Sequence, residues 1–211
     1  MMLPRFFTQG LAVIFAMALS PVVVESAAIS PRNAGPSSAA IVAVSAAGNG
    51  CPSGTVSAGF TLVKDAIDIN FSSFNTAIGP GVATSQKSKN CLITLSLSYP
   101  NGNKYAVSEG LYYGFMNQLD SGVTAQWTST YYFSTNAANT AVSQATQAGN
   151  SAWTNVNYAK SSLASSLVYP NCGASAILTV SVRFAMSATS STASGSGSLD
   201  RHRINLNWLT C

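Results

Sequence analysis

Charged residues are scarce in this chain. Only 8% of its 211 residues are Asp, Glu, Lys or Arg, well below the usual quarter in globular proteins. The ten basic residues are scattered and no two of them are adjacent, so the sequence offers no basic stripe that a nucleic-acid backbone could follow. With 47% hydrophobic residues, the chain also lacks the low hydrophobicity and high net charge of a disordered protein. We therefore expect a folded domain that does not bind nucleic acid.

Residues for acid–base or metal chemistry are also few. His202 is the one histidine of the chain, and as a catalytic base it would need an orienting carboxylate and a nucleophile. Because it stands between two arginines, we interpret it as a solvated turn histidine. A glycosidase would need two carboxylates about 5–9.5 Å apart across a groove, and Asp68, one of the five acids beyond residue 28, is predicted on a solvent-facing side of a strand. The sequence therefore predicts no catalytic residues, no metal site and no cofactor.

Long hydrophobic runs are limited to the N-terminus. Arg5 is followed by the apolar run 11–19, and small residues at 26–28 offer a cleavage site, as in a secretory signal peptide. The run is broken by Ser20 and Pro21 and is shorter than the ~20 residues that span a bilayer. The sequence predicts a signal peptide over residues 1–28 and a soluble extracellular protein after cleavage, without a membrane anchor.

The four cysteines contain no Cys-x-x-Cys pair, which argues against a zinc site. In an oxidising compartment an even count indicates two disulfides, and four cysteines allow three connectivities. We adopt the sequential pairing, Cys51 with Cys91 and Cys172 with Cys211. Each bridge would close a loop of roughly 40 residues, worth about 4 kcal/mol in the chain-entropy model.

The main structural signal is alternation with a period of two, which is typical of half-buried β-strands. It is clearest in residues 91–99, where Ile93, Leu95, Leu97 and Tyr99 alternate with hydroxyl side chains before the turn Pro100-Asn101-Gly102. Similar strands are predicted at 66–71, 104–109, 111–115, 123–133, 178–186 and 204–208. Many short strands separated by turn residues indicate an all-β fold, an antiparallel, jelly-roll-like β-sandwich with two disulfides.

Two segments interrupt this pattern. Residues 29–49 are rich in Ala, Ser, Gly and Pro and are predicted as a low-complexity flexible N-terminal arm, so that the domain itself spans residues 50–211. Residues 134–166 are rich in Ala, Asn, Thr and Ser. Their Ala and Gln content would allow a helix over 137–148, but the β-context favours a long hairpin.

The aromatic residues are the best candidates for binding. Tyr112 and Tyr113 cannot both point inward, and Tyr132 has the opposite parity to the predicted core residues of its strand, so aromatic side chains should be exposed. We select Tyr112, Tyr113, Tyr132 and Trp153 as candidate binding residues. Asn70-Phe71-Ser72 is the one glycosylation sequon outside the predicted leader, and the parity of Phe71 places Asn70 on the surface.

Several short motifs occur in a fixed order along the chain. They are Gly50–Val56, Gly79–Gly81, Lys89–Cys91, Leu95–Pro100, Asp120–Val123, Ser129–Phe133, Asn171–Gly173 and Leu206–Cys211. In this order, and with all four cysteines, the chain resembles the secreted fungal and bacterial family called domain of unknown function 4360, and residue segment 134–166 departs from its pattern. The resemblance implies a secreted, disulfide-bonded, β-rich domain, from a filamentous fungus, and brings no catalytic residues.

These observations favour a secreted, non-enzymatic protein that binds a carbohydrate or a protein at the fungal cell wall or a host surface. One alternative is a carbohydrate-active enzyme, which would need facing carboxylates. Another is a carrier of a small apolar ligand, which would need an internal cavity of several hundred Å³. The sequence specifies neither the ligand nor the oligomeric state.

Overall fold

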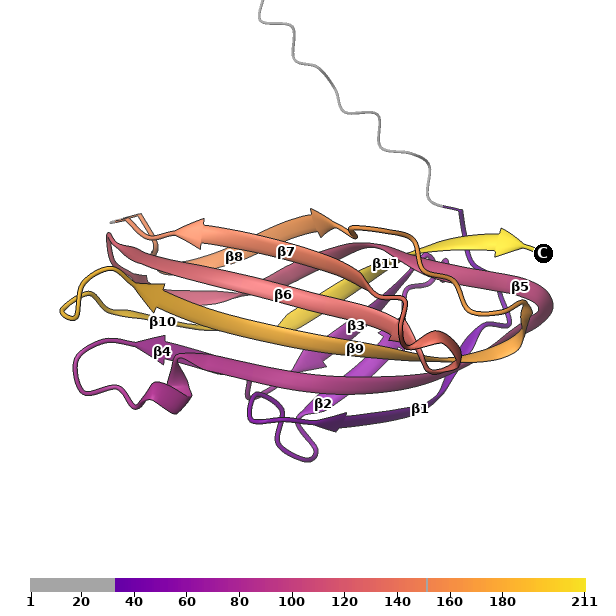
Figure 1. Ribbon diagram of the computed structural model, residues 1–211, viewed down its shortest axis with the longest axis horizontal. Coiled ribbons are helices and arrows are strands. Elements are labelled where there is room, and N and C mark those ends of the chain that lie inside the picture. The colour runs from indigo at the N-terminus through magenta and orange to yellow at the C-terminus, as the bar shows by residue number, and fades with distance from the viewer. Residues whose placement is uncertain (1–32, 151) are drawn as a thin grey trace, which may run out of the picture. The chain divides into compact units, whose positions relative to one another are not determined.

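The computed structural model describes residues 33–150 and 152–211, so the predicted signal peptide lies outside the described residues. The elements are β1 (Ala40–Ala47), β2 (Val56–Phe60), β3 (Ala66–Phe71), β4 (Asn75–Ile78), η1 (Thr84–Gln86), β5 (Ser88–Leu119), β6 (Val123–Phe133), η2 (Ser134–Asn136), β7 (Ala141–Ala148), β8 (Thr154–Leu163), β9 (Gly173–Ala188), β10 (Gly195–Ser198) and β11 (Arg201–Thr210). Strands dominate, and all their pairings are antiparallel (Figure 1). The all-β prediction is confirmed.

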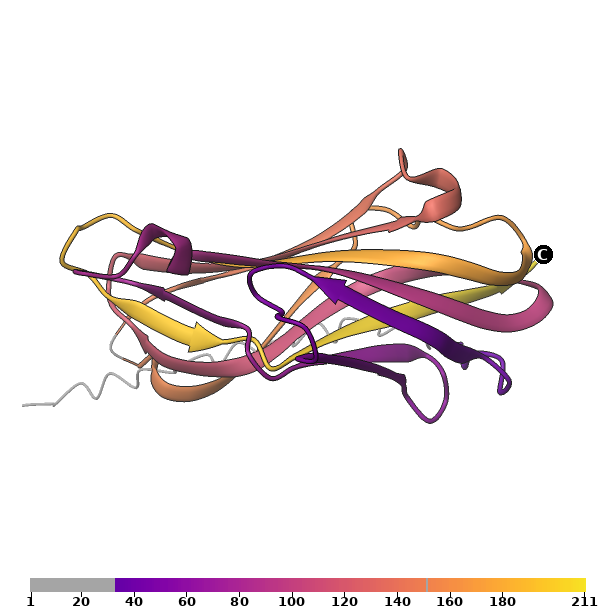
Figure 2. The same ribbon diagram turned by 90° about the horizontal axis from the view of Figure 1, so that it is seen from below.

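The strands form two layers (Figure 2). Sheet 1 has the order β1, first half of β5, β9, β6, β7. Sheet 2 has the order β2, β3, β11, second half of β5, β8. The short strand β10 pairs with β4 and with the last residues of β5. Because β5 belongs to both sheets, the hydrogen-bonded strand pairing continues from one sheet into the other.

The change of sheet within β5 occurs at the predicted turn. Gly102 has a φ of 79°, a left-handed conformation that glycine adopts without strain. Its N–H is bonded to Asn101 Oδ1 at 3.0 Å, and Asn103 Nδ2 donates to the Pro100 carbonyl at 3.0 Å. Residues up to Ser98 pair with β9, Asn103 pairs with both β9 and β11, and the residues after it pair with β11. The turn thus directs the chain across the sandwich instead of into a simple hairpin.

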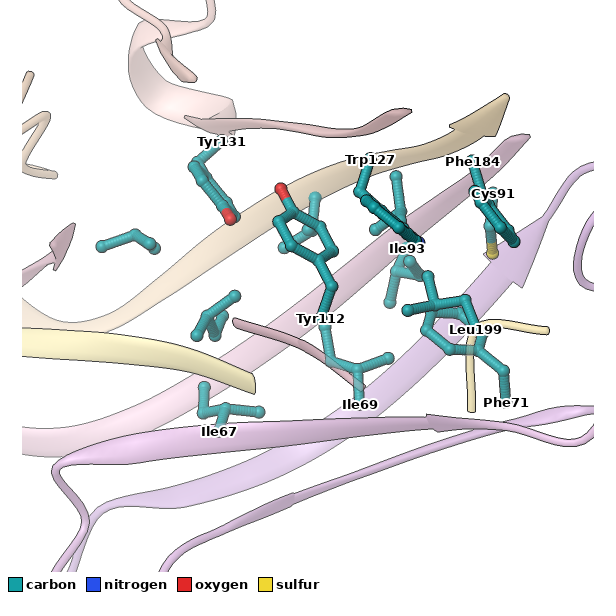
Figure 3. Close-up of a cluster of buried hydrophobic side chains, with 14 of the residues drawn as sticks. Ile67, Ile69, Phe71, Cys91, Ile93, Tyr112, Trp127, Tyr131, Phe184 and Leu199 are labelled. Atoms are coloured by element: carbon teal, nitrogen blue, oxygen red, sulfur yellow. The ribbon is translucent and has the colours of Figure 1, made fainter. Parts of the chain in front are cut away.

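Apolar side chains from both sheets fill the interior (Figure 3). β6 alternates strictly between buried and half-buried residues, so Trp127 and Tyr131 point inward as their parity predicts. The Trp127 indole stacks on Phe184 with ring centroids 5.1 Å apart. Ile67 and Ile69 of β3 close the opposite side of this cluster. A carrier of a small apolar ligand would need a cavity in this interior, but large buried side chains occupy the space.

The N-terminal segment differs from the flexible arm predicted for residues 29–49. Residues 40–47 form β1, which pairs along β5 with Ile41 opposite Leu97 and Ala47 opposite Leu92. Ala39 is 2% exposed. Composition alone suggested an arm, but the exposed edge of β5 offers unpaired backbone groups that this segment satisfies as an edge strand.

The segment 134–166 also differs in detail from its prediction. Its described residues form two strands and no α-helix, but β7 pairs with β6 of sheet 1, and β8 pairs with β5 of sheet 2. They touch only through isolated bonds, such as Gln144 N–H to Ser162 Oγ at 3.1 Å. The small inward residues Ala141, Ser143 and Ala145 are buried, so packing against the opposite sheet outweighs the helix propensity of this segment.

The two disulfides join Cys51 to Cys91 and Cys172 to Cys211, which is the sequential pairing adopted from the sequence. Cys51 precedes β2 of sheet 2, whereas Cys91 lies in the sheet 1 half of β5. Cys172 precedes β9 of sheet 1, and Cys211 follows β11 of sheet 2. Each bridge therefore connects the chain of one sheet to the chain of the other.

Candidate functional site

The four aromatic candidates do not form one surface. Tyr112 is fully buried, so its selection as an exposed binding residue is wrong. Tyr132 is half-buried on the outer face of sheet 1, opposite Thr179. Trp153 is half-buried beneath the Lys160 ammonium group, which lies 4.9 Å from the ring centroid. Tyr113 points outward from sheet 2 and is the one candidate that lies in a hollow with other polar groups.

His202 is fully buried, not solvated. Its ring stacks on Tyr112 with centroids 4.6 Å apart, and its Nε2 lies 3.0 Å from the Tyr131 hydroxyl. Tyr131 continues to Ser143 Oγ at 2.7 Å. Burial lowers the pKa of His202 to about 4 and raises the pKa of Tyr131. This interior network joins the two sheets, but a ligand has no access to it.

A row of side chains crosses the outer face of sheet 2. The register aligns Ser57, Asn70, Arg201, Tyr113 and Ala159 on five neighbouring strands, β2, β3, β11, β5 and β8. We call these five residues the outer row. With strands about 4.8 Å apart, the row extends over about 19 Å. Its two end residues are small, so the larger side chains in the middle can be approached from both ends.

The middle of the outer row opens into a hollow of about 340 Å³, which we call the Tyr113 hollow. Its lining includes Asn70, Tyr113, Asn157, Tyr158, Asp200 and Arg201. The hollow combines an aromatic ring, amide groups, a carboxylate and a guanidinium. All of these side chains except Asp200 belong to β-strands, which hold binding groups more rigidly than loops do.

Larger hollows lie elsewhere on the described chain. One, of about 530 Å³, is lined by loop residues that include Asp120, Ser190 and Thr192. A second, of about 480 Å³, lies between the segment 33–36 and the end of β11 around Trp208. A third, of about 470 Å³, lies between the loop 136–140 and the segment 166–169. None of the three gathers charged and aromatic side chains on neighbouring strands as the Tyr113 hollow does.

Ion pairs fix the arginines beside the hollow. Arg203 donates two hydrogen bonds to Asp68, from Nε at 2.8 Å and from an Nη at 2.7 Å. Arg201 Nε lies 3.8 Å from Asp68, and its guanidinium lies 4.3 Å from the Tyr113 ring centroid, in a cation–π contact. The Arg203 hydrogen bonds hold the pKa of Asp68 below its usual value. Asp68 thus holds Arg203 by two hydrogen bonds, forms a longer ion pair with Arg201, and remains ionised at neutral pH.

Replacing Asp68 is expected to weaken the fold in a pH-dependent way. The side chain is 22% exposed, so Asp68→Asn should cost about 1 kcal/mol of unfolding free energy at pH 7, less than a buried pair would. The folded-state pKa is depressed, so the stabilisation is present above the ordinary pKa of 3.8 and is lost as pH falls below it. Urea unfolding of both proteins at pH 7 and pH 2.5 measures this, and an equal difference at both pH values would contradict it.

Sequence reasoning found two members of the hollow and missed the others. Tyr113 and Asn70 were selected for separate reasons, and the structure places both in the hollow. Arg201, Asp200 and Asn157 were not selected as binding residues. Only the strand register brings these groups together. It pairs Arg201 with Asn70, for example, although they are 131 residues apart in the sequence.

The described residues define a class of protein: a disulfide-bonded antiparallel β-sandwich with a polar and aromatic hollow on the outer face of one sheet. The chain belongs to the family described as Domain of unknown function (DUF4360), whose model matches residues 37–211. The resemblance drawn from its motifs is therefore confirmed. The match includes β1, in agreement with its place in sheet 1.

A homologous protein of known source also matches most of the chain. The chain is 30% identical over 200 residues to an uncharacterized secreted protein of Arthroderma benhamiae, covering 90% of this chain and 80% of the relative. The protein is secreted and extracellular, in keeping with its two disulfides. Within the described ranges, no helix has the length and apolar character needed to cross a membrane.

The solved structures that the chain matches include two sugar complexes. One is TmCBM61 in complex with beta-1,4-galactotriose, with a TM-score of 0.25 and 10% identity, covering 81% of this chain and 90% of that chain. The other is a family 11 carbohydrate-binding module from Clostridium thermocellum in complex with a beta-1,3-1,4-mixed-linked tetrasaccharide, with a TM-score of 0.26, 9% identity and coverages of 79% and 91%. At these scores the likeness supports no conclusion about the ligand of this protein.

Proposed function

We propose that this secreted protein is a non-enzymatic binding protein that takes a carbohydrate in the Tyr113 hollow, at the fungal cell wall or a host surface. The proposal rests on one observation: the register places Asn70, Arg201 and Tyr113 side by side on three neighbouring strands. A sugar offers C–H groups on the faces of its ring and hydroxyl groups around its rim. The hollow provides an aromatic surface for the C–H groups, and amide, guanidinium and carboxylate groups for the hydroxyl groups.

The side chains around the hollow favour binding over hydrolysis. A glycosidase needs one carboxylate as an acid and a second as a base or nucleophile. Asp200 is the one carboxylate among the described residues that line the hollow. The nearby Asp68 is engaged by both oxygens with Arg203. A carbohydrate-active enzyme remains the alternative that a turnover assay distinguishes.

Removal of the Tyr113 ring tests the proposal. Tyr113→Ala should weaken carbohydrate binding about tenfold, which corresponds to about 1.4 kcal/mol of binding free energy. Arg201→Gln should weaken it similarly, because the guanidinium lines the hollow and stacks on the same ring. A glycan array identifies the ligand, and isothermal titration calorimetry measures the affinity of each variant.

The matched control is Tyr132→Ala. Tyr132 is also half-buried and strand-borne, but it lies on the outer face of sheet 1, so its loss should leave the affinity unchanged. Equal losses in Tyr113→Ala and Tyr132→Ala would place the site elsewhere. Product formation from a bound polysaccharide, abolished by Asp200→Asn, would favour the enzyme. Capture of a cell-wall or host protein without any glycan binding would favour a protein partner.

A further inference from the structure

The sequon Asn70-Phe71-Ser72 lies at the Tyr113 hollow. Asn70 is exposed, whereas Phe71 is buried in the core. Within the described part of the chain, the Asn70 amide makes no side-chain hydrogen bond, and it lines the hollow directly. The chain leaves the sheet just after Phe71, and Ser72 is exposed at the bend. The acceptor amide and the sequon hydroxyl are therefore both on the surface of a secreted protein.

Within the outer row, Arg201 lies between Asn70 and Tyr113. Arg201 is the direct cross-strand neighbour of both residues. Two strand spacings, about 10 Å, separate the Asn70 and Tyr113 backbones. The first sugars of a glycan on Asn70 would start at one wall of the hollow and have Arg201 and Tyr113 next to them. The hollow is thus within reach of a sugar that is covalently attached at its own rim.

A tethered sugar has a large advantage over a free one. A short flexible tether gives an effective concentration in the millimolar range, so even weak affinity of the hollow for the attached sugars would keep it filled. A free ligand would then have to displace them. The same groups that would bind an external carbohydrate are the ones that the attached glycan meets first.

We infer that Asn70 is N-glycosylated and that the first sugars of its glycan occupy the Tyr113 hollow, so that they compete with an external carbohydrate for the site. The closing of the site rests on the proposed function, whereas the modification itself does not. Sequon occupancy would then determine which fraction of the secreted protein binds its ligand with full affinity.

The test uses two variants at Ser72, which does not line the hollow. Ser72→Ala destroys the sequon and leaves Asn70 in place, whereas Ser72→Thr keeps the sequon and serves as the matched control. All three proteins are produced by secretion from a eukaryotic host that attaches N-glycans. Intact-mass and peptide mass spectrometry should find a glycan on Asn70 in the wild type and in Ser72→Thr, and none in Ser72→Ala. An unmodified Asn70 in the wild type would overturn the inference.

Occupancy of the hollow is measured without any external ligand. Nitration by tetranitromethane modifies accessible tyrosine rings, and Tyr132 on the opposite sheet provides an internal reference. Tyr113 should be nitrated several-fold more slowly in the glycosylated wild type than in Ser72→Ala, with equal rates at Tyr132. Equal Tyr113 rates in the two proteins would show that the glycan leaves the hollow free, and would overturn its role in closing the site.

Binding measurements separate this inference from the proposed function. With the ligand found on the array, Ser72→Ala should bind about tenfold more tightly than the glycosylated wild type, and Ser72→Thr should match the wild type. Equal affinities would overturn the gating. Absence of glycan binding by Ser72→Ala would count against the proposed function, while the mass and nitration results would still decide whether Asn70 carries sugars that fill the hollow.

Discussion

Acidification from pH 6.5 to pH 4 is expected to lower the free energy of unfolding of this protein by about 3 kcal/mol. The cause is His202, which is fully buried and whose pKa is lowered by that burial from the ordinary 6.5 to about 4. A loss of this size is a large share of the ~5–15 kcal/mol that stabilises a typical domain. The protein should therefore unfold at a markedly lower urea concentration at pH 4 than at pH 6.5.

The hydrogen bonds of His202 are all satisfied with the neutral ring. Nδ1 lies 3.0 Å from the Leu111 carbonyl oxygen, which can only accept, so Nδ1 carries the proton. Nε2 must then accept the hydrogen bond from the Tyr131 hydroxyl at 3.0 Å. Ser143 Oγ lies 2.7 Å from the Tyr131 oxygen and 2.8 Å from the Tyr112 oxygen. Protonation of Nε2 would leave a positive charge in the core, where the Tyr131 hydroxyl could offer it only a neutral acceptor.

Close packing leaves this network no room to rearrange. A Cβ at Gly110 would lie 2.3 Å from Ser143 Oγ and 2.5 Å from the Tyr131 hydroxyl, so the position fits only glycine. The His202 ring is also stacked on Tyr112, with an angle of 11° between the rings. Because His202 is 0% exposed in this packing, a charged imidazolium would have no solvent contact in the folded sandwich.

The sign and the pH window follow from the two pKa values. Below pH 6.5 the unfolded chain takes up a proton at His202, but the folded chain does so only near pH 4. Unfolding therefore becomes more favourable by about 1.4 kcal/mol per pH unit across this interval. The depressed carboxyl pKa of Asp68 acts only below its ordinary value of 3.8. The two effects thus occupy different pH ranges.

Replacement of His202 provides the control. His202→Gln should lower stability at pH 7 by about 1–3 kcal/mol, because the Tyr131 hydroxyl and the Leu111 carbonyl lose an optimally placed partner. Its unfolding free energy should then be nearly constant between pH 6.5 and pH 4. Urea titrations at half-unit pH steps compare the two slopes, and a wild-type slope retained in His202→Gln would assign the acid sensitivity to another group.

His202 also shows what a sequence can and cannot establish here. Its arginine neighbours suggested a solvated turn, but Ile204, Leu206 and Trp208 were predicted on one face of their strand, and the same parity extends back to His202. All four are buried. The alternation in residues 123–133 predicted the inward face of β6 correctly in the same way. Parity is therefore more informative than local composition, because it reflects the geometry of the strand itself.

The Tyr113 hollow could not be derived in this way. Parity placed Tyr113 or Tyr112 outward but could not choose between them, and it said nothing about which strands adjoin β5. Asn157 lies in the Ala- and Asn-rich segment that was predicted as a hairpin, yet β8 pairs with β5 instead of β7. Sheet order depends on contacts between distant strands, which no local pattern encodes.

Removal of either disulfide is expected to have the other large effect, and the two should differ. The bridges span 40 and 39 residues, so in the chain-entropy model each should contribute about 4 kcal/mol by restricting the unfolded chain. Their surroundings differ, however. Cys51 and Cys91 are 1% and 0% exposed, whereas Cys172 and Cys211 are exposed. With equal loops, any difference between the variants reports on packing in the folded state.

Two double variants make this comparison. Cys172→Ala with Cys211→Ala should lose about 4 kcal/mol of unfolding free energy. Cys51→Ala with Cys91→Ala should lose about 1–2 kcal/mol more, because the removed sulfur atoms leave a cavity in the core. Urea unfolding under non-reducing conditions measures both values. Mild reductant should likewise cleave the exposed Cys172–Cys211 bridge of the wild type first, as followed by alkylation and mass spectrometry. An equal or larger loss in the Cys172/Cys211 variant would mean that the C-terminal bridge, which fastens the end of β11 to the start of β9, contributes more than loop closure alone.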